Sequence, residues 1–126
     1  MLRTSVLVTT LLAASTMISP AQVLRINCQT QGGDIRLTQN DNKTEFKSTM
    51  DHNGCRYSYS TSGMTFEKAV IMNKPANGEL SQTGLSFFYK PKTGFTGKDS
   101  FTVYLCGTGR FGGTGCARLN YNVTVQ

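Results

Sequence analysis

The sequence has little of the side-chain chemistry that enzymes usually require. It contains one histidine, His52, and seven acidic residues. His52 lies in the turn-forming segment 51–54, and no nucleophile-elbow motif accompanies it. The acids are scattered and give no close pair of the kind that glycoside hydrolysis uses. We therefore expect no enzymatic activity and no cofactor, with a small hydrolase of unrecognised site as an alternative.

The sequence also lacks a close pair of cysteines. None of its four cysteines stands in the Cys-x-x-Cys spacing that is typical of zinc sites. Residues 40–42 read Asn-Asp-Asn and offer oxygen ligands, so a calcium ion near Asp41 and a plain Asx turn both stay open. Because the acids form no dense cluster, we expect no metal centre.

Basic residues are not gathered in runs. Lysine and arginine number 13 against seven acids, a formal net charge of +6, and a leader that includes Arg3 accounts for one of these charges. The excess favours an acidic partner, namely an anionic glycan, a membrane surface or nucleic acid, and an ordinary solvated basic surface is the alternative. Without a basic run, we expect no nucleic-acid partner.

No apolar run after residue 21 is long enough to cross a membrane, so we expect no transmembrane segment. Within residues 1–21, Arg3 precedes an apolar run at residues 6–14, and small residues then lead to Ser19-Pro20-Ala21. This pattern predicts a signal peptide at residues 1–21, removed after Ala21, rather than a membrane anchor. The mature chain, residues 22–126, is then secreted or periplasmic, and nothing in it indicates an oligomeric state.

The four cysteines all lie in the mature chain, and an even number in an exported domain predicts two disulfides. Cys106 and Cys116 each lie at an outward-facing position of an alternating run, and the two runs flank a Gly-rich loop. The two cysteines can therefore face each other across a hairpin. Cys28 and Cys55 each lie on the side of apolar neighbours. The sequence therefore favours Cys28–Cys55 and Cys106–Cys116 among the three possible pairings. Oxidised cysteines also disfavour a cysteine nucleophile.

Helix-length apolar periodicity is absent from residues 74–126, where apolar and polar residues alternate between Gly-rich turns. This predicts β-strands and an all-β fold. The expected inward faces are Phe101, Val103 and Leu105 in one strand and Ala117, Leu119, Tyr121, Val123 and Val125 in the last.

Three other segments carry weaker signals. We expect a polar turn at residues 29–33, a strand at 34–38 and another at 65–73. In the aromatic strand at 85–90, Phe88 faces away from Phe87 and Tyr89. A strand that is apolar on both faces is expected between two layers or under a loop.

Three motifs follow one another in the second half of the chain: Pro-Ala-Asn-Gly-Glu-Leu at 75–80, Phe-Tyr-Lys-Pro at 88–91, and Gly-Phe-Thr-Gly-Lys-Asp-Ser-Phe at 94–101. This series resembles the bacterial immunoglobulin-like and cadherin-like domains of secreted and surface proteins. The resemblance covers residues 74–126. It implies a Greek-key β-sandwich of about seven strands. The chain length after the leader fits one such domain, residues 22–126.

Within the third motif the residues have expected structural roles. Gly94 and Gly97 allow positive φ in a surface turn. Phe95 is expected to bury that turn, and Asp99 to accept backbone N–H bonds across it. Phe101 begins the buried face of the strand that follows.

The loop between Cys106 and Cys116 is the expected binding element. It carries Arg110 and Phe111 at its apex, among glycines that leave the apex exposed. Arginine and aromatic residues are enriched at binding hot spots. We expect Lys90, Lys92 and Lys98 to lie on nearby turns and to extend this surface.

These observations predict an exported, non-enzymatic binding module of the bacterial envelope or secreted fraction, with a protein or glycan partner. The alternative in another class is a secreted protease or hydrolase inhibitor that uses the Cys106–Cys116 loop.

Overall fold

The computed structural model describes residues 27–37, 42–59 and 63–126. These residues form strands and connecting turns, with no helix among them. The strands are β1 (Cys28–Gly32), β2 (Asn42–Met50), β3 (Cys55–Ser58), β4 (Thr65–Asn73), β5 (Gly78–Thr83), β6 (Ser86–Pro91), β7 (Gly97–Thr108) and β8 (Thr114–Val125). The all-β prediction is confirmed.

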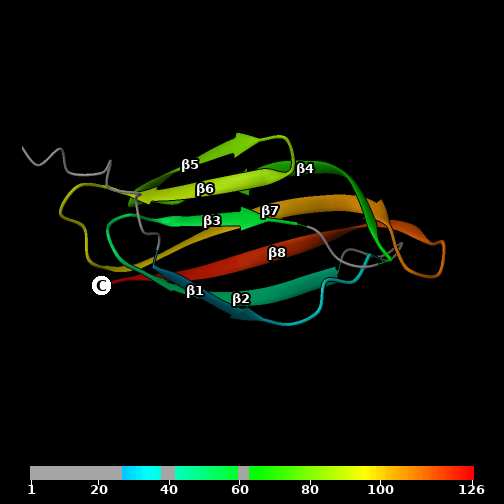
Figure 1. Cartoon of the computed structure of the whole chain (residues 1–126), viewed down its shortest axis with the longest axis horizontal. Helices are drawn as coiled ribbons and strands as arrows, with labels where there is room; N and C mark the ends of the chain where they lie inside the picture. Colours follow the sequence, from blue (N-terminus) through cyan, green and yellow to red (C-terminus); the bar gives the residue numbers. More distant parts are fainter. Residues whose placement is uncertain (1–26, 38–41, 60–62) are drawn as a thin grey trace, which may run out of the picture.

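The strands form two sheets. A five-stranded sheet has the order β1-β2-β8-β7-β4, and a three-stranded sheet has the order β3-β6-β5 (Figure 1). Neighbouring strands are antiparallel except for β2 and β8, which are parallel. The sequence-final strand β8 therefore lies in the centre of the larger sheet.

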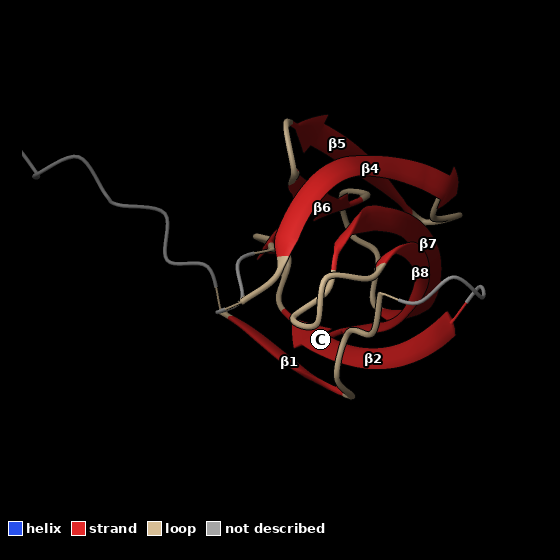
Figure 2. Cartoon of the chain, turned by 90° about the vertical axis from the view of Figure 1, so that its right-hand side faces the viewer, coloured by secondary structure: helices blue, strands red, loops and turns tan. Residues whose placement is uncertain are grey.

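The two sheets pack face to face around one apolar core, as in a β-sandwich, and the end view in Figure 2 shows the strands curving around a common interior. Phe101 of β7 contacts rings from the opposite sheet: its centroid lies 5.5 Å from that of Tyr57 and 5.8 Å from that of Tyr89. Such aromatic pairs stabilise a core beyond their buried area. They hold the two layers together at their centre.

The alternation in β7 and β8 sets the buried face of the larger sheet. The inward residues of both strands are all buried, as predicted: Phe101, Val103, Leu105, Ala117, Leu119, Tyr121, Val123 and Val125. Antiparallel pairing places Phe101 opposite Tyr121 and Val103 opposite Leu119. Because facing residues share one side of a sheet, these pairs form the floor of the core.

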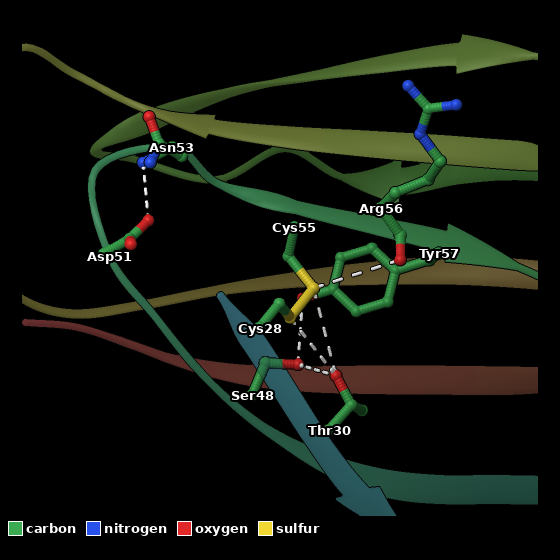
Figure 3. Close-up of a disulfide and its surroundings, with 8 residues drawn as sticks. All are labelled: Cys28, Thr30, Ser48, Asp51, Asn53, Cys55, Arg56 and Tyr57. Carbon is green, nitrogen blue, oxygen red and sulfur yellow. Dashed lines mark hydrogen bonds between the residues drawn. A yellow bond between two sulfur atoms is a disulfide. The ribbon is translucent and has the colours of Figure 1, made fainter. Parts of the chain in front are cut away.

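Both predicted disulfides are present. Cys28–Cys55 joins β1 to β3 and thus one sheet to the other, whereas Cys106–Cys116 joins facing residues of β7 and β8. Figure 3 shows the first bond beside Ser48, with Cys55 and Ser48 buried in the core. One bond therefore closes the sandwich, and the other closes a hairpin.

Two segments in the first half differ from the prediction. Residues 29–32 belong to β1, which pairs with β2, so they are no turn. Residues 33–37 are not a strand, and residue 38 lies outside the described residues. The cause is tertiary: β1 takes the free edge of β2, and the next residues cross the end of the sandwich.

The aromatic strand at 85–90 is β6, in the middle of the smaller sheet. Phe87 and Tyr89 are buried, but Phe88 is only half-buried on the outer face. The prediction that both faces are covered is wrong here. The Phe88 ring instead lies beneath Arg56, whose Cζ is 6.0 Å from the ring centroid.

The third motif forms a turn of the expected kind. Gly94 and Gly97 have φ of 80° and 130°, and Phe95 packs against the core. Asp99 accepts backbone N–H bonds, but from a different turn than expected. Its Oδ1 accepts from Ala76 at 3.0 Å and its Oδ2 from Asn77 at 3.0 Å. Asp99 therefore ties the third motif to the first.

Candidate functional site

The β7–β8 hairpin continues beyond its disulfide. Pairing extends for two further rows, to Thr108 opposite Thr114, so the loop is shorter than predicted and spans residues 109–113. Gly109 donates its N–H to the carbonyl of Gly113 at 2.7 Å, and Gly112 donates to the carbonyl of Gly109 at 3.1 Å. Gly112 has φ of 82°, which favours glycine. We call residues 109–113 the tip.

The two predicted contact residues differ in their surroundings. Phe111 is fully exposed, at 101 %. Arg110 is also exposed, but its stem lies over Gly63, where a Cβ would come within 3.1 Å of Arg110 Cγ. When a partner covers an exposed aromatic ring, apolar surface is removed from water and the complex is stabilised. Phe111 is therefore the more favourable anchor of the two.

An apolar groove of about 570 Å³ lies beside the tip. Its other walls come from residues 34–37 and from Met64. The apolar lining comprises Ile35, Leu37, Met64 and Phe111, and the charged lining comprises Asp34, Arg36 and Arg110. The groove is thus apolar within, and two cations and one anion border it.

Residues 34–37 are held in place by side chains of β2. Thr44 donates its hydroxyl to the carbonyl of Asp34 at 3.2 Å, and the Asn42 amide donates to the carbonyl of Arg36 at 3.3 Å. Leu37 is buried and joins the core. Sequence reasoning missed this wall. Its signal in the sequence is the apolar spacing of Ile35 and Leu37, which predicts a strand that the structure does not contain.

The three lysines expected near the tip lie at the opposite end of the sandwich. Lys98 is the second residue of β7, and the tip follows the far end of that 12-residue strand. At about 3.3 Å per residue, roughly 33 Å separate Lys98 from Thr108. Lys90 and Lys92 flank the same distant end, where their ammonium groups donate at 3.1 Å to the carbonyls of His52 and Ala76. They brace turns and do not extend the tip surface.

His52 has no catalytic surroundings in the described part of the chain. Its side chain is exposed, and no described residue makes a hydrogen bond to its ring. The turn around it is built by Asp51, whose Oδ1 accepts the N–H of Asn53 at 2.9 Å (Figure 3). The described residues also contain no group of three or more His, Cys, Asp or Glu side chains that could hold a metal ion. Asp41 lies outside the described residues.

The buried hydroxyl groups are engaged with one another. Tyr57 donates to Ser48 at 2.8 Å, and Ser48 lies 2.9 Å from the Thr30 hydroxyl (Figure 3). Burial raises the pKa of Tyr57 to about 12, and the bonds to Ser48 and Thr30 offset part of this effect. The hydroxyls of Tyr59 and Tyr121 lie 2.8 Å apart, and burial raises the pKa of both. These hydroxyl groups stay protonated at neutral pH, and their hydrogen bonds stabilise the core.

Comparison with models of known protein families, and with curated protein sequences, gave no match to this chain. Across residues 27–37, 42–59 and 63–126, no helix has the length and apolar character needed to span a membrane.

Proposed function

We propose that this protein is an exported, non-enzymatic binding module that receives an apolar side chain of a partner protein in the groove beside its tip. The observation that carries the proposal is the full exposure of Phe111 next to a groove walled by Ile35, Leu37 and Met64. Exposed aromatic groups beside apolar hollows are typical of protein contact sites. Because Arg36 and Arg110 outnumber Asp34 at the rim, the partner is expected to carry an acidic residue beside its apolar anchor.

The proposed fold is an immunoglobulin-like Greek-key sandwich, in line with the three motifs at residues 75–101. In support, β3, β6 and β5 have the neighbour order of strands B, E and D of such domains, and β4, β7 and β8 have that of C, F and G. One departure is β2, which lies beside β8 rather than in the smaller sheet. In such domains, binding loops cluster at the ends of the sandwich, which is where the tip lies.

Export is supported by the covalent framework. Two disulfides persist in oxidising compartments such as the periplasm or the extracellular medium. The signal peptide proposed at residues 1–21 lies outside the described residues.

The proposal is tested by photo-crosslinking in the exported fraction of the source organism. A photoreactive phenylalanine analogue replaces Phe111 in one protein and the exposed Glu79 of β5, on the other sheet, in a second protein. We expect a specific adduct from position 111 only.

A double substitution completes the test. R110A/F111A should lose the partner, whereas the control M72A/K74A, which removes one exposed apolar and one exposed basic residue elsewhere, should retain it. Equal adducts from both positions, or retention of the partner by R110A/F111A, would move the site away from the tip.

A secreted protease inhibitor is the alternative, because Arg110 sits on a hairpin closed by a disulfide. An inhibitor loop must present its specificity side chain to the enzyme, but Arg110 lies over Gly63. Under this alternative, Arg110→Ala abolishes inhibition of an arginine-specific serine protease while Phe111→Ala does not. Under the binding-module proposal, neither variant inhibits the protease, and wild type does not inhibit it either.

A further inference from the structure

A second exposed surface lies on the larger sheet, away from the tip. The outward-facing positions of β2, β8, β7 and β4 include five basic residues: Lys43, Lys47, Arg118, Lys98 and Lys68. The four lysines are exposed, and Arg118 is half-buried. We call these five residues and the sheet surface between them the basic face.

Among the residues that the structure describes, none makes a hydrogen bond or an ion pair with any of the four lysines of the basic face. By contrast, Lys90 and Lys92, at the end of the smaller sheet, donate to backbone carbonyls. The ammonium groups on the basic face are therefore available to a ligand.

Acidic residues are nearly absent from this surface. Among the described residues whose pairing places them on it, Glu45 is the one acid, and both of its oxygens accept side-chain amides, from Asn120 at 2.8 Å and Asn122 at 3.1 Å. Glu67 is exposed in the bulge of β4, next to Lys68, and is a second acid beside this surface. Neutral donors hold the Glu45 carboxylate, and neither acid forms an ion pair with the four lysines among the described residues.

Two cations on the basic face stand directly beside each other. The parallel register of β2 and β8 places Lys43 opposite Arg118.

The cations are arranged along a strip rather than in a pocket. Lys98 pairs with Thr124, and Lys68 lies in the row of Cys116, so the strip extends over eight residue steps of β8. That is about 26 Å at a strand's rise of roughly 3.3 Å per residue. A single small anion cannot span it, whereas an extended polymer can.

We propose that the basic face binds an extended anionic polysaccharide that carries carboxylate or sulfate groups. Hydroxyl side chains lie between the cations, namely Thr49, Thr124 and Ser100, and these can bond sugar hydroxyls. Single-stranded nucleic acid would need exposed rings on which bases stack. Tyr104, the aromatic residue that pairing places on this face in the described chain, is half-buried.

The test uses polygalacturonate and dextran sulfate as probes, with neutral dextran as the control polymer and oligothymidylate as the competing polyanion. Two triple variants of the mature protein are compared with wild type. K43Q/K47Q/K98Q removes three charges from the basic face, and R56Q/K90Q/K92Q removes three charges elsewhere, so both have the same net charge. Urea unfolding verifies that each variant is folded.

We expect wild type to bind at least one anionic polysaccharide, with affinity that falls as salt is added, and not to bind neutral dextran. K43Q/K47Q/K98Q should bind at least about fivefold more weakly, since three surface charge contacts are lost. R56Q/K90Q/K92Q and R110A/F111A should bind like wild type. Equal loss in both triple variants, no binding to either anionic polysaccharide, or tighter binding to oligothymidylate would each overturn the proposal. Because R110A/F111A tests the tip separately, failure here leaves the groove proposal intact.

Discussion

The hydroxyl of Tyr89 donates to Oδ2 of Asp99 at 2.7 Å, which links β6 of the smaller sheet to β7 of the larger one. Tyr89 is fully buried, at 0 % exposure. Asp99 also accepts the N–H groups of Ala76 and Asn77, so one carboxylate holds two sheets and a turn together. Hydrogen bonds to a charged acceptor are stronger than those between neutral groups.

Asp99→Asn should therefore destabilise the fold. The asparagine side chain has one acceptor oxygen where the carboxylate has two. Its NH₂ group would face one of the donors that Asp99 accepts from, and two donors cannot bond each other. We expect the free energy of unfolding to fall by about 1–3 kcal/mol, the usual cost of an unsatisfied buried group. Urea unfolding measures this, with Ser100→Ala, an exposed neighbour, as the control. A loss no larger than that of the control would contradict the role given to Asp99.

The two disulfides should differ in their contribution to stability. The loop-entropy estimate gives about 3.5 kcal/mol for the separation of 27 residues between Cys28 and Cys55, and about 2.7 kcal/mol for the separation of 10 between Cys106 and Cys116. Cys55 is also buried, at 2 % exposure, so its replacement disturbs the core. We expect C28A/C55A to unfold at a lower urea concentration than C106A/C116A. The reverse order would contradict this account.

Stability should decline in alkali because of the buried tyrosines. The unfolded chain loses the Tyr57 proton near its ordinary pKa of 10, whereas burial raises the pKa in the folded chain to about 12. Unfolding therefore releases a proton between these values, and the free energy of unfolding falls as the pH rises. For Tyr57 the fall is about 2–3 kcal/mol at roughly 1.4 kcal/mol per unit.

Tyr57→Phe provides the check on that prediction. Its free energy of unfolding should fall less steeply between pH 10 and 12 than that of wild type, because one raised pKa is removed. Tyr59, Tyr89 and Tyr121 also have raised pKa values, mainly through burial, so part of the decline remains. Identical slopes for variant and wild type would show that Tyr57 is not protected by folding.

Gly107 should tolerate no side chain. A Cβ at this position would lie 2.0 Å from the carbonyl oxygen of Thr65 and 2.9 Å from the Cα of Phe66, both on β4. Since backbone cannot move aside cheaply, Gly107→Ala should cost about 1–3 kcal/mol, as other overpacking changes do. Gly113→Ala is the matched control, because its Cβ would meet no described atom within 4 Å. Thermal unfolding compares the two, and equal midpoints would contradict the prediction.

The sequence was sufficient where the evidence was local. Period-two alternation identified the inward faces of β7 and β8, and parity identified the disulfide pairing, because both depend on which side of a strand a residue occupies. Gly94 and Gly97 were found in the same way, from the turn chemistry of glycine.

Long-range placement could not be obtained in this way. The positions of Lys90, Lys92 and Lys98 relative to the tip depend on the length and direction of β7, which continues past Cys106 to Thr108. Likewise, the wall formed by Ile35 and Leu37 exists because β2 holds residues 34–37 across the end of the sandwich. Alternation within one segment carries no information about such neighbours.

The Cys106–Cys116 bond lies two rows of pairing below the tip. Replacement of the five residues 109–113 therefore leaves the closed hairpin beneath them intact, and β8 stays seated between β2 and β7. Substitutions at the tip should therefore have little effect on the folding of the sandwich. The molecule can acquire a new recognition sequence at this position without redesign of its core, and it offers a natural framework for grafted loops.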